Sequence, residues 1–300
     1  MALTGVGPDT ASVTVEPTVP ARLGYMPGLD GVRGLFVIAV MVYHLDYPQG
    51  RSDIVLHGAF VGVDLFFVLS GYLITSLLLI ARQRSGRVVS VDFWARRIRR
   101  LLPALIIFLF MIAAYAKFVA KPYELPTLRT SALSTLFYVQ NYWQAFTTSH
   151  VVTPLGHTWS LSIEEQFYLL WPLFLAGLLR VAKSISVIAG TLVTLTFASA
   201  IIMWYEFEHH GVTHAYVTTE ARAQSLIVGG LIGILTLGWR GPQRAWVRTA
   251  MNAAGAGALL LLVYMAFRIH LYASWMYKGG FLAVALISGS VIVAIAHGGT

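Results

Sequence analysis

Two side chains that could move a proton or stabilise a developing anion, Arg33 and His44, stand near the two ends of one apolar run. They are eleven residues apart, so a helix would place both on one face, about 16 Å apart along its axis. A histidine can take a proton from a hydroxyl near neutral pH, and an arginine can stabilise a developing oxyanion. The alternative is that each side chain only reaches the nearer edge of a membrane.

Asp64 and Ser70 lie inside the next apolar run. A carboxylate in a membrane costs about 2.5–3.5 kcal/mol on insertion scales, so Asp64 needs a partner. His44 and Asp64 would lie at the same end of two antiparallel helices. We therefore predict a His–Asp pair in which the carboxylate orients the imidazole. For Ser70, beside Gly71, we favour close helix packing over a nucleophilic role.

A basic loop precedes the third apolar run, where seven of the 21 basic residues lie at 82–100. Phe93, Arg96, Arg97 and Arg100 are spaced i, i+3, i+4 and i+7, which predicts one face of a helix at the membrane surface. Their charge could fix the orientation of the protein and contact anionic lipid. Alternatively, the guanidinium groups bind the phosphates of a cytosolic donor.

Two adjacent carboxylates, Glu164 and Glu165, begin a further apolar helix. Ser162 followed by Glu165 three residues later is the pattern of a capping box, which gives Glu165 a structural reason to be there. Glu164 has no such reason, and we predict that it has a functional role. Arg222 opens a later apolar run, and we expect it to face the protein interior.

The remaining candidates for metal binding are few. The three histidines at 209, 210 and 214 lack a convincing metal-site spacing, and we predict that they belong to a solvated loop. The chain has no cysteine, which excludes disulfides and thiolate sites. We therefore predict no metal site.

The composition indicates that these residues lie in a membrane. Charged residues make up 11% of the 300 residues and hydrophobic residues 57%, whereas a soluble domain carries about 25% charged residues. Nearly uncharged runs that approach 20 residues predict membrane-spanning helices and exclude a β-barrel. The net charge of +8 is concentrated in one loop, which is typical of membrane orientation and gives no support to nucleic-acid binding.

We predict an all-α, polytopic membrane helix bundle with about eight spanning helices. The predicted spans are 29–46, 59–81, 101–119, 165–182, 185–206, 222–239, 249–267 and 275–296. If the further apolar stretch at 131–146 enters and leaves on one side, twelve basic residues face the cytoplasm and five face outward. We therefore predict a re-entrant element there, a disordered cytoplasmic tail at 1–26 and a membrane domain at 27–300.

The ionisable residues stand in four blocks that resemble the membrane acyltransferase-3 family, whose members O-acylate sugars of polysaccharides, glycolipids and small glycosides. The blocks are Leu29-Asp30-Gly31-Val32-Arg33-Gly34 with His44 behind it, Gly62-Val63-Asp64-Leu65-Phe66-Phe67-Val68-Leu69-Ser70-Gly71, Arg96-Arg97-Ile98-Arg99-Arg100-Leu101-Leu102-Pro103, and Trp159-Ser160-Leu161-Ser162-Ile163-Glu164-Glu165-Gln166-Phe167-Tyr168. The family usually has ten core helices, so the resemblance implies that this chain lacks the last ones.

The resemblance implies an essential His44 supported by Arg33, and an acyl-CoA donor. It also implies that Asp64, Ser70, Arg96, Arg97 and Glu164 belong to the working core. We expect a multi-pass protein of the inner (cytoplasmic) membrane that transfers an acyl group, with acetyl favoured, to a carbohydrate or glycolipid.

The rival hypothesis is a proton-coupled transporter or exporter, in which Asp64, His44 and Glu164 would form a proton relay. It predicts internal repeats, whereas the polar motifs are concentrated before residue 170.

Overall fold

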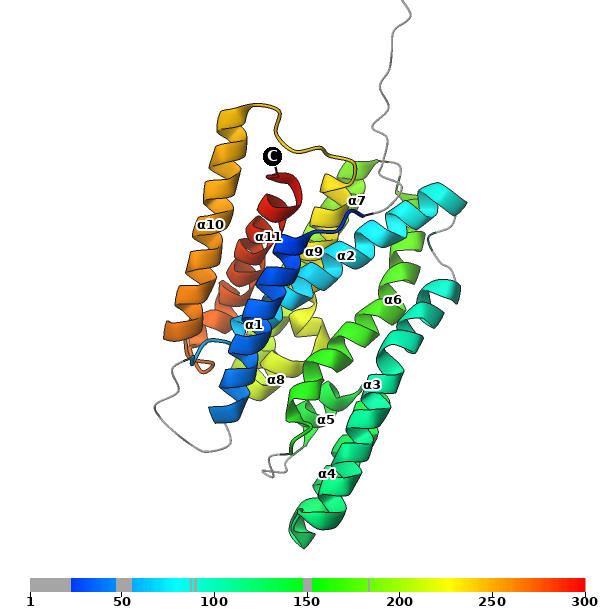
Figure 1. The fold of residues 1–300 in the computed structure, drawn as a ribbon, viewed down its shortest axis with the longest axis vertical. Coiled ribbons are helices and arrows are strands. Elements are labelled where there is room, and N and C mark those ends of the chain that lie inside the picture. Colours follow the sequence, from blue (N-terminus) through cyan, green and yellow to red (C-terminus); the bar gives the residue numbers. More distant parts are fainter. Residues whose placement is uncertain are drawn as a thin grey trace, which may run out of the picture.

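A computed structural model describes residues 23–46, 56–86, 88, 91–147, 153–182 and 184–299, and these residues form helices and connecting turns without a strand (Figure 1). Most of the tail predicted at 1–26 lies outside the described residues. The long helices are α1 Pro27–Asp46, α2 Val61–Ser85, α3 Val91–Phe118, α6 Trp159–Val181, α7 Ile185–His210, α9 Thr219–Thr236, α10 Ala245–Arg268 and α11 Phe281–His297.

Each of the eight predicted spans falls on one of these helices. Six of them are long and apolar enough to cross a membrane, namely α1, α2, α3, α7, α10 and the helix that ends at His297. The other two, α6 and α9, contain ionisable residues close to their starts, at Glu164 and Glu165 in α6 and at Glu220 and Arg222 in α9. The prediction of a polytopic helical membrane protein is confirmed.

Helix α2 lies at the centre of the bundle, where most of its residues are buried. It packs closely on α9 because small residues face each other across the contact. A β-carbon at Gly71 would lie 1.9 Å from the carbonyl oxygen of Leu226, and one at Gly229 would lie 1.9 Å from that of Val68. The predicted close packing beside Ser70 is thus carried by Gly71.

The stretch at 131–146 forms parts of two short helices, α4 Leu125–Leu136 and α5 Gln140–Phe146. Neither helix is long enough to cross a bilayer, since 12 and seven residues span only about 18 Å and 10 Å. The turn between them has Tyr138 in the left-handed region at φ 55°. In Figure 1, α4 lies along the C-terminal half of α3, and α5 returns toward the start of α6. This helix–turn–helix has the form expected of a re-entrant element.

Buried polar groups hold α5 against α6, as a re-entrant segment requires. The backbone N–H of Gln140 donates to the Ser162 hydroxyl at 3.2 Å, and the Gln166 amide donates to Asn141 at 3.0 Å. Two further short turns are the 3₁₀ helix η3 at Gly156–Thr158 and the helix α8 at Val212–Val217.

Candidate active site

A cavity of about 370 Å³ lies between α1, α2, α3 and α6. Five of the eight predicted site residues line it, namely Arg33, Ser70, Arg97, Arg100 and Glu164. Along α2 its lining runs from Val63 to Leu77, which corresponds to about 21 Å of helix. The cavity is therefore long enough to accommodate an extended ligand.

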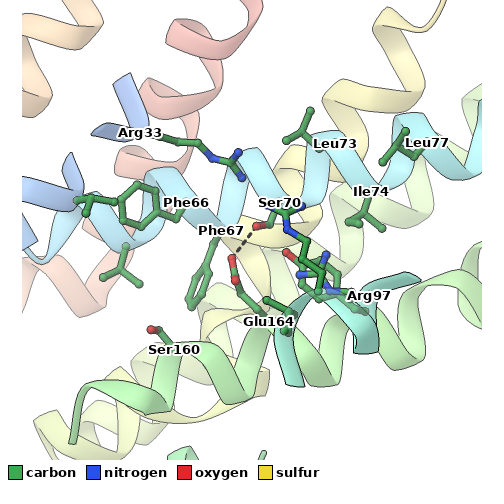
Figure 2. A pocket seen from close by; sticks show the side chains of 15 residues that line it. Arg33, Phe66, Phe67, Ser70, Leu73, Ile74, Leu77, Arg97, Ser160 and Glu164 are labelled. Atoms are coloured by element: carbon green, nitrogen blue, oxygen red, sulfur yellow. Dashed lines mark hydrogen bonds between the residues drawn. The ribbon is translucent and has the colours of Figure 1, made fainter. Parts of the chain in front are cut away.

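The centre of the cavity holds a carboxylate and a hydroxyl. The Ser70 hydroxyl donates a hydrogen bond of 2.6 Å to Oε1 of Glu164. Figure 2 shows Arg33 and Arg97 reaching toward this pair from different helices. Ser70 therefore has a polar partner in Glu164, in addition to the close helix packing at Gly71.

Arg97 is fixed by two contacts with α6. Its Nε donates to Oε1 of Glu165 at 3.1 Å, and its guanidinium carbon lies 3.1 Å from the centroid of the Tyr168 ring. The Trp94 indole donates to the Tyr168 carbonyl oxygen at 3.1 Å. Ion pairing together with stacking holds the planar guanidinium in one orientation, which preorganises Arg97 at the cavity wall.

The capping box predicted for Ser162 and Glu165 is wrong, because α6 begins at Trp159 and its N-cap is Thr158. Ser162 is thus already inside the helix, where its hydroxyl donates to the Thr158 carbonyl oxygen at 3.2 Å. Glu165 is instead the ion-pair partner of Arg97. Both carboxylates of the pair at 164 and 165 therefore belong to the site region.

Arg96 does not line the cavity, although its neighbours Arg97 and Arg100 do. Successive helical residues are about 100° apart, so the face that Arg97, Arg100 and Leu101 present to the cavity leaves Arg96 exposed. The predicted donor-binding face is therefore narrower than the sequence spacing suggested.

Asp64 is fully buried and has its partners on α9. Its Oδ2 accepts from Nη2 of Arg222 at 2.9 Å and its Oδ1 accepts from the Ser225 hydroxyl at 2.7 Å. The predicted His44–Asp64 pair is therefore wrong, because α9 packs against the face of α2 that carries Asp64. A permanently charged arginine compensates a buried carboxylate better than a neutral imidazole does.

The expectation that Arg222 faces the interior is confirmed, since its side chain has no exposed surface. Its guanidinium carbon lies 4.3 to 5.7 Å from the centroids of four aromatic rings, those of Phe67, Trp159, Tyr216 and Phe281. Rings at this distance attract a cation through their quadrupoles. Asp64 and Arg222 thus form a charged centre of the bundle that lies outside the cavity lining.

His44 lies two helical turns beyond Val37, the last residue of α1 that lines the cavity. Its Nδ1 lies 2.8 Å from the Val40 carbonyl oxygen. A carbonyl oxygen only accepts, so we infer that the proton sits on Nδ1 and that Nε2 carries the free lone pair. The backbone of α1 thereby orients the imidazole, which is the role predicted for Asp64.

His157, in η3, is a site neighbour that the sequence did not indicate. Its ring packs edge to face with that of His44, with centroids 6.0 Å apart. Burial lowers the pKa of His157, and the nearby His44 lowers it further. Three residues later, Ser160 lines the cavity, so this histidine pair stands beyond the Ser160 end of the cavity.

The sequence profile of a family described as an acyltransferase domain matches residues 26–298. The chain is 34% identical over 284 residues to a peptidoglycan O-acetyltransferase of Listeria monocytogenes, and 34% identical over 288 residues to a Bacillus subtilis protein whose name carries the same activity provisionally. Each alignment covers 91% of this chain and 44% of the relative, so the chain spans less than half the length of these relatives. No solved structure matches the chain. The match over residues 26–298 shows that the chain belongs to the membrane acyltransferase-3 family.

Proposed function

We propose that the chain transfers an acetyl group from cytosolic acetyl-CoA to a carbohydrate hydroxyl of the cell envelope, on the opposite side of the cytoplasmic membrane. Family membership supports acyl transfer, and the name of the Listeria relative supports a peptidoglycan-type acceptor. The observation that carries the proposal is the long cavity, which has arginines in its wall and ends near a histidine with a free Nε2.

The arginines of the cavity are assigned to the donor phosphates. Arg97 and Arg100 come from α3 and Arg33 from α1, and guanidinium groups bind phosphate oxygens through paired charge-assisted hydrogen bonds. Arg33 stands about 16 Å along α1 from His44, so we assign it to the donor and not to the oxyanion. The Glu164–Ser70 pair lies between these groups and offers hydrogen-bond partners to the amides of the donor arm.

The reaction itself is assigned to the region just beyond the Ser160 end of the cavity, where His44 lies. Nε2 of His44 takes the proton of the acceptor hydroxyl, whose oxygen attacks the thioester carbonyl carbon. The carbon–sulfur bond of the resulting tetrahedral species then breaks, and the imidazolium returns the proton to the leaving thiolate. The products are the O-acetylated carbohydrate and free CoA. Asp64, paired with Arg222, supports the helices that hold these groups.

The donor assignment predicts that Arg97→Gln weakens binding of a non-transferable acetyl-CoA analogue by about 10- to 150-fold, because a charge-assisted contact is worth about 1.5–3 kcal/mol. Arg100→Gln should weaken it by about tenfold, since Arg100 is exposed to screening. Binding is measured by calorimetry on the purified protein in detergent.

Arg96→Gln is the matched control, because it removes the same charge from the same helix outside the cavity. Its donor affinity should stay within about twofold of the wild type. If Arg96→Gln weakened binding as much as Arg97→Gln, the effect would come from general surface charge, and the cavity would not be the donor site.

The proposal also requires a defined orientation, which single cysteines can test because the chain has none of its own. Tyr123→Cys and Thr213→Cys should react with an impermeant thiol reagent added outside intact cells, and Ser184→Cys and Gln243→Cys only after lysis. All four positions are exposed. The reverse pattern would place the Arg100 end of the cavity outside and contradict a cytosolic donor.

A further inference from the structure

Glu206, His210 and His214 gather where α7 ends and α8 begins. Glu206 and His210 are one helical turn apart on α7, and the chain then turns at Gly211, which has φ +86°. This turn brings His214 of α8 back over the same carboxylate. Nδ1 of His210 lies 2.8 Å from Oε2 of Glu206, and Nδ1 of His214 lies 2.7 Å from it.

The three ligand atoms all lie within 4.8 Å of one another. The side chains of His214 and Glu206 are only 12% and 14% exposed, whereas that of His210 is 48% exposed. The predicted loop is therefore wrong, because His209 and His210 end α7 and His214 lies in α8, where it is largely shielded from solvent. The cluster is enclosed on the α8 side and open on the His210 side, which leaves room for water to reach it.

Hydrogen bonding within the cluster is incomplete. His210 bonds with Glu206, but the buried Nδ1 of His214 makes no hydrogen bond despite its short distance to the same oxygen. One carboxylate oxygen thus faces two ring nitrogens and is hydrogen-bonded to only one of them. A cation held between the three atoms would use both nitrogen lone pairs and the carboxylate charge together.

Charged and aromatic neighbours of the cluster have contacts of their own. The nearby lysine, Lys278, is engaged with a different carboxylate, because its Nζ lies 2.6 Å from Oε1 of Glu208. The His214 ring packs edge to face on Phe146 of α5, with centroids 4.9 Å apart, so its rotation is restricted. His209 lies outside the cluster, and its Nδ1 lies 2.8 Å from the Tyr205 carbonyl oxygen.

We propose that Glu206, His210 and His214 bind a divalent transition-metal ion, with Zn²⁺ as the best match. Two imidazoles and one carboxylate are a known zinc ligand set, with metal–ligand distances of about 2.0–2.2 Å, and water can fill the fourth position. In the sequence, Glu206, His210 and His214 follow one another at intervals of four residues. This regular spacing is not visible when only the histidines are considered.

The ion joins the end of α7 to α8. Helix α8 carries Tyr216, whose ring lies 4.7 Å from that of Trp159 and 5.0 Å from the guanidinium carbon of Arg222. A fixed α8 therefore holds one wall of the aromatic cage around Arg222. This structural role is independent of the acyl-transfer proposal.

The test uses the full chain in detergent, purified with a histidine-free tag and stripped with a chelator. Titration with Zn²⁺ at pH 7.5 should show one ion per chain by elemental analysis, and Co²⁺ should give the visible absorption of a four-coordinate site. Zn²⁺ should also raise the melting temperature by a few degrees, because a ligand that binds only the folded state stabilises it. His209→Ala, which removes a histidine outside the cluster, should behave as the wild type.

His214→Ala and Glu206→Gln should each weaken Zn²⁺ binding by on the order of 100-fold and abolish the thermal shift, because either change leaves two ligands. Two variants in different helices guard against the loss of one through misfolding. The proposal is overturned if the wild type binds much less than one equivalent at micromolar Zn²⁺. It is equally overturned if binding survives in the folded His214→Ala or Glu206→Gln variant, which would place the ion elsewhere.

Discussion

Replacing His44 with alanine is expected to lower the rate of acyl transfer by about 10²- to 10⁴-fold, which is the usual contribution of a general base. Acetyl-CoA affinity should stay within about twofold, because His44 does not line the cavity that holds the arginines. Transfer is measured with saturating donor, and affinity with a non-transferable analogue on the same preparation. The two measurements separate a chemical role from donor capture.

His157→Ala is the comparison variant for this prediction, because His157 is the neighbour of His44. It removes the ring packed on His44 but leaves the contact between His44 Nδ1 and the Val40 carbonyl oxygen. We expect a loss of about tenfold or less, since the imidazole keeps its tautomer and only its packing is loosened. Wild-type turnover by His44→Ala, or equal losses in both variants, would contradict the assignment of His44 as the base.

The fold was predictable because each span is a long apolar run bounded by polar residues. That 131–146 holds no spanning helix was predictable as well, since the distribution of basic residues disfavours a crossing there. The family resemblance implied that Arg33, Ser70, Arg97 and Glu164 belong to the working core, and the structure lines one cavity with all four of them. Polar side chains on apolar helices usually face the interior of the bundle, where they meet one another.

The pairing of the buried charges was not predictable in the same way. The position of a residue along a helix fixes its depth, but the face it uses depends on which helix packs there. The glycines Gly71 and Gly229 bring α9 onto α2, and this contact decides that Asp64 meets Arg222 and not His44. The usable signal was the presence of one acidic and one basic residue inside two apolar runs, each in need of a partner.

Breaking that pair is expected to have the largest effect on stability. Arg222→Met leaves Asp64 buried without its cation, and loss of one partner of a buried ion pair costs about 3–5 kcal/mol. We expect the variant to accumulate poorly and to melt well below the wild type in detergent. Arg240→Met, which removes an exposed arginine from the segment after α9, should leave the melting temperature unchanged.

The double variant Asp64→Leu with Arg222→Met separates the two roles considered for Asp64. Removing both charges relieves the unpaired carboxylate, so we expect the double variant to recover much of the stability lost in Arg222→Met. If Asp64 only anchors the bundle, the stable double variant should retain acyl transfer within about tenfold, because the Val40 carbonyl oxygen still orients His44. A double variant that folds and binds donor but loses transfer as completely as His44→Ala would return Asp64 to the catalytic machinery. Stability no better than in Arg222→Met alone would show that Arg222 is held mainly by its aromatic rings, which lie 4.3 to 5.7 Å from its guanidinium carbon.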